Sequence, residues 1–588
     1  MTTEAEASTA EKESQKALYD ILAALDSRSN FKLEAGAGAG KTTSLINALK
    51  HVLADKSKYL PRSGQRVACI TYTNVARNEI IQRTDASPHV FAETIHGFLW
   101  EVISPFKKAL LDEIISLPRW ASLLDGRTSL QGFTVAYDLG FRGLDRETVT
   151  LHHDDVPALA IRLLSKRKFR SIVADKFPII FVDEYQDTPA GLAEAMLDST
   201  SGSLAESTYG FFGDHWQQIY DRTCGSIDHL RVLPIQQKSN WRSSSAVVSL
   251  LNQMRPELPQ APMAGAAKGS VIAYHTNSWV GPRGSRSKKG QIPDDVLNRT
   301  LRWVTDKTRE QNWGGEPKVL MLTHSSIASE LGFGGIDKVY KYNEDYVRRR
   351  DEVIAFLLDV IEPCSDYFRH RQYGPMFDVL KRTRPRMQNR SDKVGWSELF
   401  AQIDTVRTAG TVGDLVDIVL RQKYFSPPQA LLDRQRKWEQ GRREPEAGQE
   451  ISLSRRVEEF GKLRAVSYRE VLALRNYVEE KTPFSTQHGV KGAEYPSVLA
   501  VFGGWTRYNF PAMLANFPDR ESLSDEEVKR FERSRNLFYV ACSRAKMDLA
   551  LLFTTELSKE ALRTLEEWLG ASGVVAVQYT SEDMPMSS

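Results

Sequence analysis

The sequence predicts an α/β protein built on two parallel sheets. Short apolar runs recur along the chain, several of them end in Gly or polar residues, and helical patterns follow many of them. Buried runs that alternate with helices are typical of parallel α/β sheets. One group of runs lies before about residue 240 and the other after about residue 265, which indicates two α/β domains. The expected strands are 30–36, 66–73, 178–184, 209–214, 270–276, 318–325, 497–504 and 549–555.

Bulk properties narrow the class of protein. A chain of 588 residues is too long for one core and predicts roughly three to five domains. The formal net charge is only +3, so any basic surface for nucleic acid has to be local. Four scattered cysteines without a CxxC pair argue against a zinc site and fit a reducing cytosol. The polar N-terminus and the lack of a long apolar run predict a cytoplasmic protein without a membrane partner.

Two long stretches interrupt the alternation of strands and helices. Residues 99–176 are mainly helical in pattern, with no convincing buried strand, and residues 335–483 are helical and charged. We expect both to be helical inserts in α/β domains. The basic run 369–393 within the second insert is either a solvated charged face or a surface for phosphate backbones. Residues 581–588 are expected to form a disordered tail.

The first chemical signal is AGAGAGKTT, residues 35–43, which follows a predicted strand and opens a predicted helix. This setting is the one that a phosphate-binding loop requires. The glycines let backbone N–H groups turn toward phosphate oxygens, and the helix N-terminus adds a positive dipole end. Lys41 would reach the β- and γ-phosphates, and the Thr42 hydroxyl would coordinate Mg²⁺. The predicted ATP-binding loop consists of Ala35, Gly36, Ala37, Gly38, Ala39, Gly40, Lys41, Thr42 and Thr43.

The second signal is FVDEYQDT, residues 181–188, where an apolar run ends abruptly in acids. Charged groups at the end of a buried strand are costly unless they have a partner. We expect this strand to run beside the phosphate loop, so that Asp183 holds Mg²⁺ and Glu184 orients and deprotonates the attacking water. Gln186 and Asp187 are not needed for hydrolysis and suggest that the site communicates with another part of the molecule.

Further motifs follow in a fixed order. The chain resembles the UvrD/Rep-like helicases of superfamily 1 in DEYQD and the phosphate loop, and the family's other motifs have counterparts downstream and upstream. They are TYTNVARNEI (71–80), TIHGF (94–98), GDHWQQIY (213–220), NWRSS (240–244), TQHGVKGAEY (486–495) and FERSRNLFYVACSRAK (531–546).

The resemblance implies two RecA-like parallel-sheet P-loop domains, each with a mainly helical insertion, and ATP between them. The first domain would comprise residues 1–98 and 177–240, with an insert at 99–176. The second would comprise residues 241–334 and 484–580, with an insert at 335–483.

The resemblance also assigns roles in the ATP site. Gln15 would bind the adenine edge, Trp241 would stack on the adenine, and Glu494 would contact the ribose. Gln217 would sense the γ-phosphate, and Arg242 and Arg544 would reach across the cleft to it like arginine fingers. The implied catalytic set is Lys41, Asp183, Glu184, Gln217, Arg242 and Arg544, with Thr42 and Asp183 as metal ligands and ATP and Mg²⁺ as cofactors.

Nucleic-acid contacts would come from motif loops that face away from ATP. The matching positions are Thr73, Asn74, Thr94, His96, Arg222 and His488. Arg222 replaces the base-stacking Trp that is usual in the family, although a guanidinium can also stack on a base. Val75 replaces a Lys, and Asn536 stands where a second Arg is common. His152 and His153 are better explained as part of a polar loop than as a metal site.

These observations favour an ATP-driven translocase on single-stranded DNA that separates strands at duplex junctions, 3′ to 5′ by resemblance, in DNA repair or antiphage defence. A second hypothesis is a DNA-gated switch that controls a protein partner such as a nuclease with little unwinding. A P-loop metabolic kinase is a weaker third class, because it would not need Arg242, Arg544 and the motifs of a second domain. The motifs do not exclude RNA.

Overall fold

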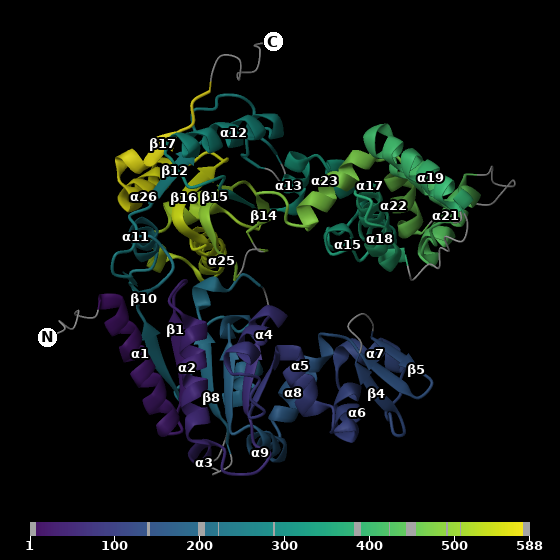
Figure 1. The fold of residues 1–588 in the computed structure, drawn as a ribbon. Coiled ribbons are helices and arrows are strands. Elements are labelled where there is room, and N and C mark those ends of the chain that lie inside the picture. The colour runs from purple at the N-terminus through teal and green to yellow at the C-terminus, as the bar shows by residue number, and fades with distance from the viewer. Residues whose placement is uncertain are drawn as a thin grey trace.

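Two α/β units lie one above the other, and each carries a lobe on the same side (Figure 1). The computed structural model describes residues 8–137, 142–197, 206–220, 223–285, 289–380, 390–422, 424–442, 454–487, 489, 492–505 and 507–579. Within these ranges, no helix combines the length and apolar character needed to cross a membrane.

The first unit is built on a six-stranded sheet in the order β3-β2-β7-β8-β1-β9. Every pairing in it is parallel. The strands in the centre are apolar and fully buried, as a sheet covered on both faces requires. The strands are β1 (Asn30–Ala35), β2 (Val67–Thr71), β3 (Val90–Thr94), β7 (Ile179–Asp183), β8 (Thr208–Gly213) and β9 (Val232–Gln237).

Helices on this sheet begin at polar caps. The Ser8 side chain and Glu11 form a capping box at the start of α1, and the Thr73 hydroxyl caps α4. The helices are α1 (Thr9–Asp26), α2 (Lys41–Ala54), α3 (Lys56–Tyr59), α4 (Asn74–Arg83) and α10 (Leu192–Leu197).

The lobe on the first unit combines helices with a small mixed sheet, order β4-β6-β5. Val149 and Leu151 of β6 are buried, so the expectation that residues 99–176 hold no buried strand is wrong. These strands have only three or four residues, too short to produce a long apolar run. The elements are α5 (Ile95–Ile103), α6 (Lys107–Ile115), α7 (Ala121–Leu124), β4 (Thr134–Tyr137), β5 (Gly143–Asp145), β6 (Thr148–Leu151), α8 (Asp155–Leu164) and α9 (Arg167–Lys176).

The second unit contains another six-stranded parallel sheet, in the order β14-β13-β15-β16-β12-β17. A short parallel pair, β10 (Ser239–Asn240) with β11 (Ala261–Pro262), lies at the junction between the units. The other elements are α11 (Ser245–Met254), β12 (Ser270–His275), α12 (Asp294–Glu310), β13 (Lys318–Met321), α13 (His324–Leu331), β14 (Phe484–Thr486), β15 (Tyr495–Phe502), α24 (Phe510–Ala515), α25 (Asp525–Cys542), β16 (Ala545–Phe553), α26 (Lys559–Leu569) and β17 (Val574–Ala576).

The lobe on the second unit is helical in its described residues, as the sequence predicts. Buried Glu362 accepts hydrogen bonds from Tyr468 at 2.9 Å and Arg407 at 2.9 Å, which ties helices α17, α19 and α23 together. The helices are α14 (Gly334–Val339), α15 (Glu344–Val347), α16 (Glu352–Phe356), a π-helical turn (Leu357–Ile361), α17 (Glu362–Arg369), α18 (Tyr373–Leu380), α19 (Arg390–Ala409), α20 (Val412–Arg421), α21 (Gln429–Gly441), α22 (Arg455–Arg464) and α23 (Tyr468–Val478).

Each lobe shares an apolar core with the sheet that carries it. One core joins Ile70 and Ile180 of the first sheet to Leu159 and Trp120 of its lobe. Another joins Leu499 of the second sheet to Trp396 and many other side chains of the helical lobe. The fold is therefore α/β with two parallel sheets and mainly helical insertions, which confirms the predicted class.

Candidate nucleotide and nucleic-acid sites

The glycine-rich loop connects β1 to α2 at the carboxyl edge of the first sheet. Gly38 and Gly40 have φ values of 75° and 89°, in the left-handed region that favours glycine. Lys41 opens α2, and its Nζ donates to the Ala35 carbonyl at 3.4 Å. The loop thus has the strand–turn–helix geometry that places backbone N–H groups and a lysine around phosphates.

Residues from the junction and from the second unit form hydrogen bonds with the backbone of this loop. Asn240 Nδ2 and Gln260 Nε2 donate to the Ala37 carbonyl at 3.0 and 3.2 Å. The Trp241 amide donates to the Gly38 carbonyl at 2.9 Å, and the Ala37 amide donates to the Tyr539 hydroxyl at 3.2 Å. The conformation of the loop therefore depends on residues on both sides of the junction.

The acidic strand β7 ends at buried Asp183, but it does not run beside β1. Strand β8 lies between them, and the three strands are parallel, so they end at the same edge of the sheet. Asp183 and Lys41 still interact electrostatically, because all the parallel strands end at one edge of the sheet. Burial and the negative charge of Glu184 raise the pKa of Asp183 to about 7, against the opposing influence of Lys41.

Glu184 is linked to the segment after β8. It adopts a left-handed backbone conformation with φ 50°, and its side chain accepts a hydrogen bond from Gln186 Nε2 at 2.5 Å. Gln186 Oε1 in turn accepts from the Asp214 amide at 3.0 Å. The amide of Gln186 thus connects the expected base to the segment that carries Gln217.

Two arginines of the second unit converge on the same region. Buried Arg544 donates from Nη2 to Gln217 Oε1 at 3.3 Å. Burial and the nearby positive charge of Arg242 lower the pKa of Arg544 to about 10. Arg242 forms an ion pair with Glu494 at 2.5 Å, and a Cβ added to Gly38 would lie 2.8 Å from the Arg242 Cβ. Arg242 therefore lies next to the phosphate loop, and Arg544 lies next to Gln217.

The structure also describes the other residues that are expected to contact ATP. The Trp241 ring is half-exposed, and its Cδ1 would lie 3.5 Å from a Cβ on Gly40. Glu494 pairs with Arg242 and with Lys546, the latter at 2.8 Å. Gln15 is exposed on α1, a helix that contacts β10 and β11. Thr42 is half-buried and Thr43 exposed in the first turn of α2.

The predicted metal ligands have suitable chemistry. The Thr42 hydroxyl and the Asp183 carboxylate are oxygen donors, which Mg²⁺ prefers. A divalent cation would also supply positive charge beside a carboxylate whose burial opposes its ionisation.

The nucleic-acid residues predicted in the first unit lie at helix N-termini. The Thr73 hydroxyl accepts from the Ala76 amide at 3.2 Å, and the Thr94 hydroxyl accepts from the Gly97 amide at 3.3 Å. Asn74 is exposed at the start of α4. Arg222 and His488 fall outside the described residues.

His96 contacts the lobe of the first unit. Its ring stacks on His153 with centroids 3.4 Å apart, and His153 Nδ1 hydrogen-bonds the Tyr137 hydroxyl at 2.8 Å. Burial and the charge of His153 lower the pKa of His96 to about 4. His153 therefore lies between the His96 imidazole and the Tyr137 hydroxyl.

An exposed aromatic pair is absent from the predicted contact residues. Tyr72 and Tyr220 are 42% and 36% exposed, and their rings stack with centroids 5.6 Å apart. Tyr72 follows β2 and Tyr220 closes the GDHWQQIY segment, so one lies directly before Thr73 and the other shortly after Gln217. The signal in the sequence is a tyrosine within each motif, but only the fold brings the two together.

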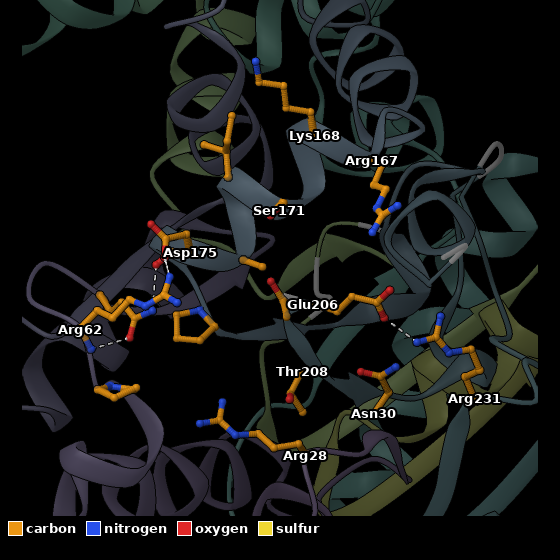
Figure 2. A pocket seen from close by; sticks show the side chains of 16 residues that line it. Arg28, Asn30, Arg62, Arg167, Lys168, Ser171, Asp175, Glu206, Thr208 and Arg231 are labelled. Atoms are coloured by element: carbon orange, nitrogen blue, oxygen red, sulfur yellow. Dashed lines mark hydrogen bonds and ion pairs between the residues drawn. The ribbon is translucent and has the colours of Figure 1, made fainter. Parts of the chain in front are cut away.

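A separate cavity of about 1200 Å³ lies at the opposite edge of the first sheet (Figure 2). Its lining includes Asn30 and Thr208, the first residues of β1 and β8, whereas the phosphate loop follows the last residue of β1. Arg62 pairs with Asp175 there, and Arg231 pairs with Glu206 at 2.6 Å. The cavity is thus remote from the nucleotide site.

The fold and this site define a P-loop nucleoside triphosphatase with two sheet domains. The sequence of residues 20–222 matches the family model described as an AAA domain, and residues 432–556 match the UvrD-like helicase C-terminal domain. With the fold, these two matches support a UvrD/Rep-like helicase of superfamily 1 and indicate an ATP-hydrolysing enzyme.

Curated relatives give a closer comparison. The chain is 22% identical to a Gabija protein GajB from Bacillus cereus strain HuB5-5, across 93% of this chain and 96% of that protein. It is also 29% identical to a Gabija protein GajB from Bacillus cereus strain VD045, over 27% of this chain and 32% of that protein. The first similarity extends over nearly the whole of both chains.

Proposed function

We propose that the protein is a translocase that moves along single-stranded DNA, 3′ to 5′, and separates strands at duplex junctions. ATP would bind on the phosphate loop with Mg²⁺ held by Thr42 and Asp183. Glu184 would take the proton of the attacking water, and Lys41, Arg242 and Arg544 would stabilise charge on the transferring phosphoryl group.

One observation carries this proposal: Arg544, from the second unit, donates to Gln217 of the first at 3.3 Å. A γ-phosphate near Gln217 would give both arginines a charge-assisted partner only while the two units are together. Hydrolysis would remove that partner and let the units separate. Repeated closing and opening would move the protein along a strand.

The Tyr72–Tyr220 pair supports a single strand as the track. Exposed aromatic rings stack on bases without regard to sequence, which suits a motor that has to pass over every base. Direction is proposed from the family resemblance alone.

We place this activity in antiphage defence. Similarity to a Gabija protein along 93% of the chain favours defence over general DNA repair. A cytoplasmic location and a nuclease or other protein partner belong to the same proposal.

A second candidate is a DNA-gated ATPase that controls such a partner with little unwinding. It is favoured by the expected DNA-contact residues: His96 is stacked on His153, and Val75, which replaces a lysine of the family motif, is 78% exposed. Both features weaken the grip on a phosphate backbone that processive unwinding needs.

The first test is steady-state ATP hydrolysis with and without single-stranded DNA, with Lys41→Ala as the inactive reference. Strong stimulation by DNA is expected. An active ATPase that ignores DNA would overturn the translocase and the DNA-gated switch together.

Tailed duplexes separate the two candidates. Displacement of the duplex strand from a 3′-tailed substrate, and not from a 5′-tailed one, is expected for the translocase. DNA-stimulated hydrolysis without displacement from either substrate would favour the switch.

A further inference from the structure

Arg255 extends from the second unit into a buried acidic pocket of the first. It follows α11, a helix that packs against β12 and β16, and only 2% of its surface is exposed. Its Nη1 lies 2.6 Å from Asp214 Oδ1, and its Nη2 lies 2.8 Å from Glu34 Oε1. Glu34 belongs to β1 and Asp214 follows β8, so one guanidinium joins the two units.

The acidic pocket is shaped for a cation. Ligand atoms of Glu34, Asp214 and His215 lie within 4.8 Å of one another, a spacing that could also hold a metal ion. Arg255 already donates to both carboxylates, and His215 Nδ1 lies 2.7 Å from Glu34 Oε1. The first unit therefore supplies the acids and the second unit supplies their cation.

Electrostatics favour the charged forms of Glu34 and Arg255. Burial opposes ionisation of Glu34, but the His215 hydrogen bond and the positive charge of Arg255 lower the pKa of its carboxyl group. Burial likewise opposes the Arg255 charge, and the charges of Asp214 and Glu34 raise the pKa of the guanidinium. Removing one partner would leave the other charge buried, which is strongly destabilising.

Asp214 connects this cluster to the nucleotide site. Its Oδ2 accepts from Gln217 Nε2 at 2.8 Å, while Gln217 Oε1 accepts from Arg544. The Asp214 amide donates to Gln186, whose own amide group donates to Glu184. Holding Asp214 therefore fixes the orientation of two side-chain amides, one of which is the expected γ-phosphate sensor and the other of which holds the expected base.

The neighbouring residue reinforces the same contact. The Trp216 ring is 4% exposed, with the Arg255 guanidinium 5.2 Å and the Arg535 guanidinium 4.0 Å from its centroid. Asn536 Nδ2 donates to the carbonyls of His215 and Gln218 at 3.4 and 3.2 Å. Residues 215–218 are thus held by groups from α25 as well as by Arg255.

We propose that Arg255 is a positioning residue for ATP hydrolysis. By holding Asp214, it orients Gln217 and, through Gln186, Glu184, so that the hydrolytic geometry forms only when α11 of the second unit is seated against the first. The inference rests on the proposed roles of Gln217 and Glu184. It provides a route by which movement of the second unit reaches the γ-phosphate without passing through Arg242 or Arg544.

The test compares kcat and KM for ATP in the full-length protein carrying Arg255→Lys. Lysine keeps the charge but cannot donate to Glu34 and Asp214 in the same forked geometry. We expect kcat to fall roughly 10- to 100-fold, as misplaced catalytic groups do, with KM changed far less. Arg530→Gln removes an exposed cation from α25 and should leave kcat unchanged.

A second variant distinguishes a positioning role of Arg255 from a purely structural one. Asp214→Asn should lower kcat to a similar extent, and the double variant with Arg255→Lys should be no worse than the more impaired single variant, because both break one chain of contacts. A folded Arg255→Lys protein with wild-type kcat would overturn the proposal. So would losses that multiply in the double variant.

Glu34→Gln covers the case in which Arg255→Lys does not fold. It weakens the ion pair between Arg255 and Glu34 and leaves the Asp214 side chain unchanged. We expect a smaller fall in kcat than in Arg255→Lys, with KM unchanged. Wild-type kcat in this variant would contradict the proposal. All of these comparisons use ATP hydrolysis measured without DNA. If the wild-type protein hydrolyses ATP but is not stimulated by DNA, the translocase proposal fails, and the variants still test the role of Arg255.

Discussion

The two sheets share one topology and differ in what their loops present. In each, the strands lie in the order third, second, fourth, fifth, first and sixth along the chain. In the first sheet, the loop after the opening strand is glycine-rich, with Gly38 and Gly40 in the left-handed region, and leads directly into α2. In the second, the loop after β12 folds around Arg283, whose guanidinium donates to the carbonyls of Thr276 at 2.6 Å and Gly290 at 3.1 Å.

This difference shows that the strand order alone does not determine where a nucleotide site can form. The same strand order carries a glycine-rich loop in one unit and, in the other, a loop whose described residues are held by the Arg283 guanidinium. The inserts also occupy different positions. One lies between the third and fourth strands of its sheet, and the other lies between the second and third strands. In the proposed site, the second unit would contribute Arg242 and Arg544, and the loop equivalent to the phosphate loop would take no part.

The largest effect is expected when one lysine is replaced in each of the two loops. Lys41→Ala should lower kcat/KM for ATP by on the order of 10³-fold, because a phosphate-binding cation is lost. Lys289→Ala, in the equivalent loop of the second sheet, should remain close to wild type. Comparable losses in the two variants would show that both loops serve the nucleotide.

The contribution of the second unit is tested next at Arg242. Arg242→Ala should lower kcat by about 10²- to 10³-fold, because a transition-state cation is removed. Lys546→Ala is a matched control, since Lys546 also pairs with Glu494. Steady-state kinetics at saturating ATP distinguish them, and an equally impaired Lys546 variant would assign the effect to Glu494.

A smaller effect is expected on the nucleic-acid face of the first unit. Tyr72→Ala should weaken binding of single-stranded DNA by about 1–3 kcal/mol, and Tyr72→Phe should retain most of it, because stacking needs the ring alone. Fluorescence anisotropy of a labelled oligonucleotide measures this. Tyr19→Ala, at an exposed position on α1, is the control. Unchanged affinity in Tyr72→Ala would remove the pair from the DNA path.

The smallest effect concerns the contact between His96 and His153. The pKa of His96 is about 4 in the folded protein, below its usual 6.5, so the unfolded chain binds more protons between these values. Stability should therefore fall as pH drops from about 7 toward 4. His96→Phe should reduce the fall in Tm between pH 7.5 and 5.0, whereas His370→Gln, an exposed substitution, should not. An undiminished fall in the Phe variant would contradict the assignment.

Local sequence patterns are sufficient to predict the central strands of both sheets, the glycine-rich loop and the acidic residues after β7. Central strands are buried on both faces, so their apolar runs identify them. The strands β3 and β9 are half-exposed, do not form such runs and are not among the predicted strands. The glycine-rich loop and the acids after β7 are likewise recognisable because their chemistry is concentrated in a few consecutive residues.

Contacts between distant segments cannot be predicted in this way. The Ala37 amide and the Tyr539 hydroxyl meet only because the two units pack together. Arg255 stands outside the recognised motifs, and its partners belong to the other unit, where Glu34 lies in β1 and Asp214 follows β8. Such contacts depend on the relative placement of the sheets, which no local pattern encodes.

The strand order also bears on how the chain folds during synthesis. The first sheet is complete once β9 has emerged, so it can close early and bury its apolar strands. In the second sheet, β12 (Ser270–His275) lies between β16 (Ala545–Phe553) and β17 (Val574–Ala576), which come much later in the chain. Pairing between such distant segments is slow, and β12 has no strand partner until it occurs. The second sheet is therefore expected to close more slowly than the first.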